Sequence, residues 1–144
     1  YTMMGDTVNL AARLESSAKQ YGIYNFVGHP IYENAKDDYV FRFLDFTKVK
    51  GKNIPVKVYE LINRKSMIKK ETIDLVNEFE IGMDLYFQQK WDDALKQFNK
   101  SEKMEDHFES RNTTPSAVFI KRCKLFKSNP PGKDWDGVWT MTSK

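Results

Sequence analysis

The sequence YVFRFLDFTKVKGKNIPVKVYELI, residues 39–62, indicates a β-hairpin. Residues 39–49 are rich in aromatic and β-branched side chains, and residues 56–62 alternate between apolar and polar side chains; both patterns are typical of strands. The residues between them, KGKNIP at 50–55, contain glycine and proline and predict a turn. Because so short a turn joins the two strands, we predict that they pair in an antiparallel sheet.

Residues upstream of the hairpin predict a helix, a strand and a second, short helix. The first helix can begin at Asp6, whose carboxylate can cap its first turn, and it can end at Gly22. Residues 23–27 are typical of a strand, and residues 29–36 predict a short helix with Pro30 in its first turn. Together with the hairpin, these elements indicate an α+β fold in which helices flank an antiparallel sheet.

The first predicted helix carries a polar strip beside an apolar one. On a helical wheel at about 100° per residue, Asn9, Arg13 and Gln20 lie together. The apolar stripe beside them consists of Leu10, Ala11, Leu14, Ala18 and Tyr21. Asn9 and Arg13 are one turn apart, so they can reach one partner from the same face. Taken alone, such a pair is more commonly part of an ordinary solvated helix face.

Three further helices are predicted after the hairpin, because apolar residues recur there at helical spacing. These helices cover residues 70–89, 90–104 and 114–128. Thr114 can cap the last of them, and Pro115 suits its first position. A Pro-Pro pair then stops the helix. Trp135 and Trp139 follow, and we expect them to pack back onto the rest of the chain.

The chain therefore divides into a sheet-containing block, a short linker, a helical region and a Trp-rich tail. The expected boundaries are residues 1–62, 63–68, 69–128 and 129–144. The expected fold is a partial antiparallel sheet with flanking helices, followed by an all-α helical hairpin region.

The composition excludes several classes of protein. The 144 residues are 40% hydrophobic and 14% aromatic, enough for a core, and the net charge is only +3. Positive charge is spread along the chain, which argues against a nucleic-acid partner. Cys123 is the only cysteine, so no internal disulfide can form, and a reducing cytoplasmic setting fits. We see no apolar run near the ~18 residues that a membrane span needs, and no signal peptide.

The segment GDTVNLAARLE, residues 5–15, resembles the Gly-Asp-x-Val-Asn-x-Ala-x-Arg segment of class III nucleotidyl cyclases. VKGK at 49–52, with the strand ending VYEL behind it, resembles a later loop of the same family. The resemblance runs collinearly over residues 1–62 and implies a ferredoxin-like sheet. These enzymes convert a nucleoside triphosphate into a cyclic nucleotide and pyrophosphate. Such a reaction needs positioning and cationic groups more than covalent catalysis.

The resemblance assigns four site residues. Asn9 would orient the ribose, and Arg13 would stabilise the α-phosphate in the transition state. Lys50 would contact the terminal phosphates. Thr2 would read the purine, and threonine at that position resembles the bacterial adenylyl cyclase type, with ATP as substrate, whereas guanylyl cyclases more often have cysteine there. The simpler alternatives are a turn lysine at Lys50 and a strand residue without base contact at Thr2.

The family also uses Mg²⁺ or Mn²⁺, held by two aspartates on a strand that should lie upstream of Tyr1. Asp6 belongs to the helix entry, and the other aspartates of residues 1–62 (Asp37, Asp38 and Asp45) match no ligand position. The chain thus resembles the downstream part of a longer protein and offers one side of a site shared with a homodimer partner or with the missing N-terminal half. Alone, it is expected to be inactive and to associate through exposed apolar surface.

Residues 78–106 resemble a single tetratricopeptide-type helix pair, with Gly82, Ala94 and Phe98 at the small–small–aromatic spacing of that repeat. An alternative function follows: a non-catalytic protein-interaction module that recruits a partner through the helical tail. We predict that the aromatic stripe of these helices is core and that Cys123 is buried or half-buried. His29 and His107 have no second ligand at metal spacing and are expected at the surface.

Overall fold

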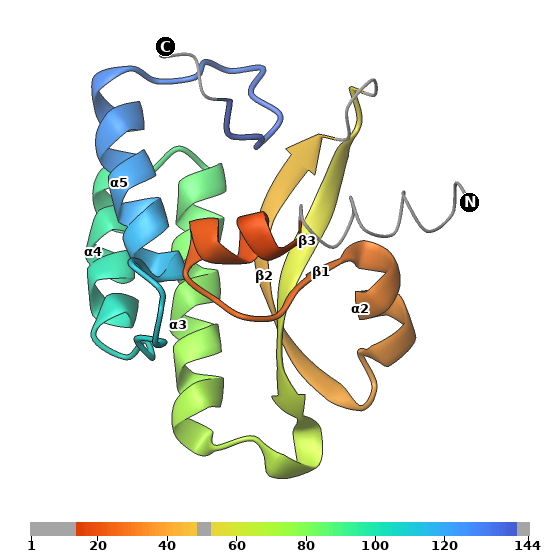
Figure 1. The fold of residues 1–144 in the computed structure, drawn as a ribbon. Helices are drawn as coiled ribbons and strands as arrows, with labels where there is room; N and C mark the ends of the chain where they lie inside the picture. The colour runs from red at the N-terminus through yellow and green to blue at the C-terminus, as the bar shows by residue number, and fades with distance from the viewer. Residues whose placement is uncertain (1–13, 49–52, 141–144) are drawn as a thin grey trace.

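The computed structural model describes residues 14–48 and 53–140, and within them the fold is α+β (Figure 1). Three antiparallel strands form one sheet in the order β1-β3-β2. The strands are β1 (Phe26–Gly28), β2 (Tyr39–Lys48) and β3 (Pro55–Arg64). The predicted hairpin is confirmed, since β2 and β3 pair directly. The upstream strand is shorter than predicted and begins only at Phe26.

A β-bulge in β2 decides which side chains face the helices. Arg42 pairs with Glu60, whereas Asp45 pairs with Val58, so Leu44 is an extra residue between them. In a regular strand, residues three apart point to opposite faces. Because of the bulge, Arg42 and Asp45 pair with residues two apart on β3 and therefore share one face of the sheet.

The helices lie on both sides of this sheet. Figure 1 shows α3, α4 and α5 grouped on one side and α2 on the other. The helices are α2 (His29–Ala35), α3 (Lys70–Phe87), α4 (Trp91–Glu102) and α5 (Pro115–Ser128), and a 3₁₀ turn, η1 (Lys65–Met67), follows β3. Within the described residues, no helix is both long and apolar enough to cross a bilayer.

Local sequence signals explain where several helices begin or end. The helical residues 14–21 end at Gly22, whose φ is +76°, a conformation that favours glycine. Pro30 occupies the first turn of α2. α5 begins as predicted, with Thr114 accepting a hydrogen bond from the Ala117 N–H at 3.1 Å and Pro115 at its first position.

One hydrophobic core joins the sheet to the helices. Leu44 and Val58 from the strands lie in the same cluster as three buried phenylalanines of α3–α5: Phe79, Phe98 and Phe119. Ala18 and Tyr21 of the predicted apolar stripe are buried in it, whereas Leu14 is exposed. The predicted core assignments for the aromatic stripe and for Cys123 are therefore confirmed. Asn63 and Arg64 belong to β3, and the predicted domain boundaries stay predictions.

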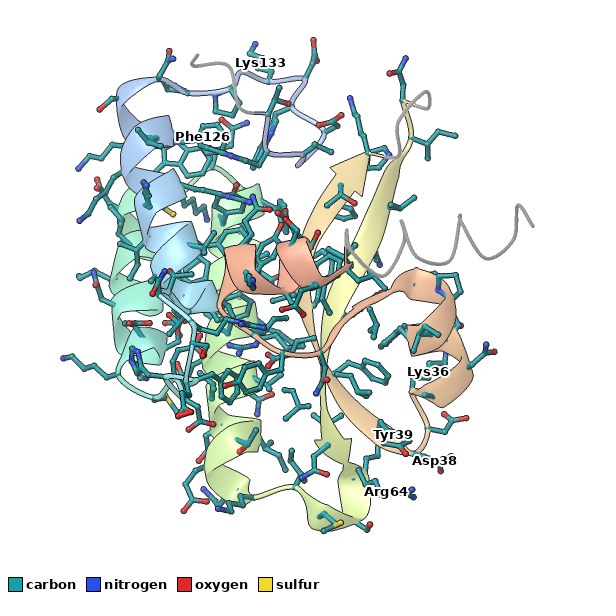
Figure 2. The ribbon with its side chains drawn as sticks, in the orientation of Figure 1. Lys36, Asp38, Tyr39, Arg64, Phe126 and Lys133 are labelled. Atoms are coloured by element: carbon teal, nitrogen blue, oxygen red, sulfur yellow. The ribbon has the colours of Figure 1, made fainter. Side chains whose placement is uncertain are left out.

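The C-terminal tryptophans pack back onto the helices, as expected. Trp135 lies against Tyr86 and Trp91, with ring centroids 5.3 and 5.9 Å away. Figure 2 labels Phe126 on α5, and the rings of Trp135 and Trp139 both lie 5.1 Å from it, centroid to centroid.

Gly82 allows α3 and α4 to approach closely, and we predict that alanine there destabilises the fold. A Cβ at this position would lie 2.6 Å from the ring of Phe98, which is fully buried. Overpacking costs about 1–3 kcal/mol, against a gain of about 1 kcal/mol in helix propensity. Because Phe98 is fully buried and has little room to move aside, we expect a cost in the upper part of that range. Urea unfolding of Gly82→Ala should therefore show a net loss of about 1–2 kcal/mol.

Gly28→Ala is the matched control, because a Cβ there meets only Pro30 Cδ at 3.6 Å. Its stability should stay within about 0.5 kcal/mol of the parent. A Gly82→Ala protein as stable as Gly28→Ala would contradict the close approach of the two helices.

Candidate functional site

The four predicted site residues, Thr2, Asn9, Arg13 and Lys50, lie outside the described residues. The structure does describe the elements that adjoin them. Helical residues 14–21 follow Arg13 directly, and β2 ends two residues before Lys50. The contacts that fix these two elements therefore decide how the chain approaches Arg13 and Lys50.

The helical segment 14–21 is fixed at its C-terminal end by a shared carboxylate. Tyr21 donates its hydroxyl hydrogen to Asp45 Oδ2 at 2.6 Å, and Arg122 Nη1 donates to the same oxygen at 2.7 Å. Asp45 Oδ1 accepts from the Phe46 N–H at 2.9 Å. The three side chains come from the helix, β2 and α5, and all are buried. One carboxylate thus connects three elements that are far apart in sequence.

The pKa values of this group follow from burial and charge. Burial raises the pKa of Asp45, while the Arg122 charge and the Tyr21 hydrogen bond act against that rise. Burial also raises the pKa of Tyr21, helped by the charge of Asp45. For Arg122, burial lowers the pKa, but the combined effect of Asp45, Tyr86 and Tyr21 outweighs it and the pKa is raised overall. The guanidinium therefore stays charged.

The connector between α4 and α5, residues 103–114, contacts the chain immediately after the helical segment. Arg111 Nε donates to the Ile23 carbonyl at 2.7 Å, and the Tyr24 hydroxyl donates to the Glu109 carbonyl at 2.5 Å. The guanidinium of Arg111 lies 4.8 Å from the Tyr24 ring centroid. Gly22 lies so close to the Thr113 carbonyl that a Cβ would not fit.

A second buried charge cluster lies on the same face of the sheet. Arg42 Nη2 donates to Glu60 Oε1 at 2.7 Å, and its Nη1 donates to Glu105 Oε2 at 2.8 Å. Glu105 also accepts from the Ser116 hydroxyl at 2.7 Å. Burial raises the pKa of Glu60, and Arg42 partly offsets that rise. The cluster therefore ties the hairpin to the α4–α5 connector and to α5.

A hollow of about 430 Å³ lies where the helical segment, the end of β2 and the tail meet. Its lining includes Gln20, Thr47, Lys48, Arg122, Val138 and Trp139. The tail adjoins β2 here, because Phe46 and Val138 form a parallel β-bridge and Lys48 pairs with Asp136 at 3.0 Å. The end of β2 that leads to Lys50 is thus also fixed by the C-terminal segment.

Metal chemistry finds no support among residues 14–48 and 53–140, where no three His, Cys, Asp or Glu side chains lie close enough to hold an ion. The two histidines agree with the surface prediction: the side chains of His29 and His107 are 42% and 68% exposed. His29 Nδ1 lies 3.0 Å from the Tyr59 hydroxyl. The part of the chain that the structure describes therefore does not form a divalent metal site.

Sequence reasoning missed the role of the buried charges. It treated Asp45 only as a residue that matches no metal-ligand position, and it did not consider Arg42 or Arg122. A signal was available, because Arg42 and Asp45 interrupt the apolar run of the strand FRFLDF. A charge within a buried strand requires a partner. The partner itself, 77 positions away for Asp45, leaves no local trace.

Comparison with known proteins finds relatives named adenylate cyclase. The chain is 32% identical over 127 residues to the "Adenylate cyclase, terminal-differentiation specific" of Dictyostelium discoideum, covering 85% of the chain and 6% of that protein. It is 40% identical over 62 residues to "Adenylate cyclase 1" of Rhizobium meliloti, covering 43% of the chain and 9% of the relative. It is 35% identical over 63 residues to the adenylate cyclase of Anabaena cylindrica, covering 42% of the chain and 12% of that relative.

These similarities support a cyclase-related function. The chain spans about 6–12% of the length of these relatives. No protein-family model matches the chain, and no solved structure matches it significantly. The Dictyostelium match covers 85% of the chain, so it cannot be confined to residues 1–62 and includes part of α3–α5.

The buried Arg42 cluster should contribute far more to stability than the exposed pair of Lys48 and Asp136. Arg42→Met leaves two buried carboxylates without a counter-charge, which costs about 3–5 kcal/mol. Lys48→Met removes a pair whose side chains are 38% and 40% exposed, which costs less than about 1 kcal/mol. Chemical denaturation of both variants measures the difference, and equal losses would refute the assigned burial.

Cys123 should be chemically inert in the folded chain. The thiol is fully buried, and burial raises its pKa to about 12, so the reactive thiolate is scarce at about pH 8. Ellman's reagent should react within minutes only after denaturation in guanidinium chloride. Rapid reaction of the native protein would show that the helical core opens around α5.

Proposed function

We propose that this chain is the C-terminal part of a bacterial-type class III adenylate cyclase, which converts ATP into cyclic AMP and pyrophosphate. The observation that carries the proposal is the Gly-Asp-x-Val-Asn-x-Ala-x-Arg segment at residues 5–13, in a chain whose relatives are named adenylate cyclase. The chain would supply the ribose- and phosphate-binding side of a dimeric site. The enzyme would act in cytoplasmic signal transduction.

In this proposal the described sheet is part of a ferredoxin-like catalytic sheet. Thr2 reads the adenine, Asn9 orients the ribose and Lys50 binds the terminal phosphates. The ribose 3′-oxygen loses its proton and bonds to the α-phosphorus while the bond to the pyrophosphate oxygen breaks. Arg13 faces the charge that develops on the α-phosphate, and a fixed cation there lowers the barrier.

The divalent cation, Mg²⁺ or Mn²⁺, would be bound by residues outside this chain. The described residues offer no ligand group for it. The partner that completes the site is a second subunit or the N-terminal half of the catalytic domain. We therefore expect that the chain alone makes no cyclic AMP.

The packing of α3 on α4 supports a tetratricopeptide-like helix pair. Gly82, Ala94 and Phe98 are buried, and Gly82 lies against the Phe98 ring. One such pair cannot form a solenoid, which needs about three repeats. The alternative, a non-catalytic interaction module, is not favoured, because α3–α5 contact the sheet through buried charges and the relatives are named as enzymes.

The test is cyclic AMP formation from ATP and manganese by the full-length protein that contains this chain. Arg13→Ala should lower kcat by about 10²–10³-fold with little change in KM, because the contact is made in the transition state. Arg64→Ala is the control. Arg64 is an exposed residue beside Tyr39 (Figure 2), and the two pair at the hairpin end opposite Lys48 and Pro55.

An unchanged kcat for Arg13→Ala would remove this residue from its proposed role. Cyclic AMP made by the isolated chain would contradict the shared-site arrangement. A full-length protein without activity toward ATP would overturn the proposed function itself.

A further inference from the structure

We infer that the helical region α3–α5 is a positioning element of the nucleotide site, acting through Tyr21, Asp45 and Arg122. It would fix the direction of the helical segment 14–21, which follows Arg13 directly and, in the sequence prediction, continues the helix that carries Asn9 and Arg13. This inference rests on the proposed function for its catalytic consequence. Its structural part, the dependence of the helical segment 14–21 on Asp45 and α5, can be tested without any enzymatic activity.

The first step is that Tyr21 connects the end of the helical segment to β2 and α5. Tyr21 is the last helical residue before Gly22, and its hydroxyl reaches across to β2 and α5. Both its hydrogen-bond acceptor and the cation beyond it are buried. A hydrogen bond to a buried charged group is stronger than one between neutral groups. The end of the helix is therefore fixed to a rigid frame of strand and helix.

The second step is that the connector residues 103–114 contact the chain on both sides of the helix end. Before it, Arg111 Nη2 lies 3.6 Å from Glu15 Oε2. After it, Arg111 also binds the Ile23 carbonyl, and the Tyr24 ring stacks on Phe108 with centroids 4.7 Å apart. Contacts on both sides limit rotation and sliding of the helix as well as tilt.

The third step is the geometry of the predicted helix. Arg13 precedes Tyr21 by eight residues, or about 12 Å along a helix at 1.5 Å per residue. A tilt of about 5° at Tyr21 would thus shift Arg13 by about 1 Å. Misplacement of a catalytic group by about 1 Å can lower a rate by about 10²-fold. A small tilt of the helix at Tyr21 would therefore cause a large loss in the rate of the reaction at the α-phosphate.

The fourth step is that the same carboxylate lies on the strand that leads to the second predicted phosphate contact, Lys50. Asp45 lies on β2, five residues before Lys50. The tail also adjoins this end of the strand through Val138 and Asp136. The helix and the strand that lead to Arg13 and Lys50 are thus both fixed against the C-terminal half. This arrangement suits a region that positions the site better than one that recruits a partner.

Tyr21→Phe is the sharpest test, because it removes only the link to the helix. The ring stays to fill its place in the core, and Asp45 keeps its bonds to Arg122 and Phe46. In the 144-residue chain, amide hydrogen exchange should become about tenfold or more faster across residues 17–21, the loss expected for one hydrogen bond to a charged group. Exchange in α3 and α4 should not change.

Tyr59 provides a matched control in this chain. Tyr59→Phe removes a hydroxyl bonded to His29 at the α2 side of the sheet, away from Asp45 and Arg122. This substitution should not change exchange across residues 17–21. An equal increase in Tyr59→Phe, or no increase in Tyr21→Phe, would overturn the inference.

The catalytic consequence is measured in the full-length enzyme. Tyr21→Phe should lower kcat by about tenfold or more and leave KM within about twofold, since the ground-state contacts to ATP remain. Tyr59→Phe should retain the parent kcat. Asp45→Asn/Arg122→Gln, which replaces the charged pair with neutral hydrogen-bonding groups, should also lower kcat.

Failure of the proposed function and failure of the positioning inference give different results. If the parent enzyme makes no cyclic AMP, the proposed function fails, while the exchange experiment still reports on the coupling. If the parent is active and Tyr21→Phe loosens residues 17–21 without lowering kcat, the coupling exists but α3–α5 does not position the site. A parallel rise in KM and fall in kcat would indicate general loss of structure and would also count against positioning.

Discussion

The structure depends on one buried carboxylate that serves three elements at once. Asp45 accepts from Tyr21 and Arg122 through a single oxygen and from the Phe46 N–H through the other. An isolated carboxylate in such a place would be strongly unfavourable, and these three donors together offset the cost of burying it. The positions of the helix end, the strand and α5 are therefore decided together, because moving any one of them leaves a buried polar or charged group without a partner.

The bulge in β2 makes this arrangement possible. Without the extra residue at Leu44, Arg42 and Asp45 would face opposite sides of the sheet. With it, both face α3–α5, where Arg42 meets Glu105 and Asp45 meets Arg122. In one contact the strand supplies the cation, and in the other it supplies the anion. The two contacts together therefore specify one way of docking the helical region. A helix bundle attached only by apolar contacts could slide along the sheet with less penalty.

Much of the local structure could be predicted from the sequence, because its causes are local. The hairpin, the short helix at Pro30 and the capped start of α5 at Thr114 are all set by neighbouring residues. The start of β1 was predicted three residues early, since Ile23 is apolar like a strand residue but is buried beside the helix end instead. The docking of α3–α5 could not be predicted, because Asp45 and Arg122 are 77 positions apart.

The candidate site divides in the same way. Its proposed reacting groups are visible in the sequence, since a short segment carries them, and they lie outside the described residues. The contacts that hold the helix after that segment, from Asp45 and Arg122, are visible only in the three-dimensional structure. The Dictyostelium relative matches 85% of the chain, so the similarity extends beyond the sheet into the helices that hold it. A sheet and a helical region that share buried ion pairs cannot change independently, because losing either partner of a pair leaves the other uncompensated. The helical region is therefore better understood as part of the same structural unit as the site than as an attachment to it.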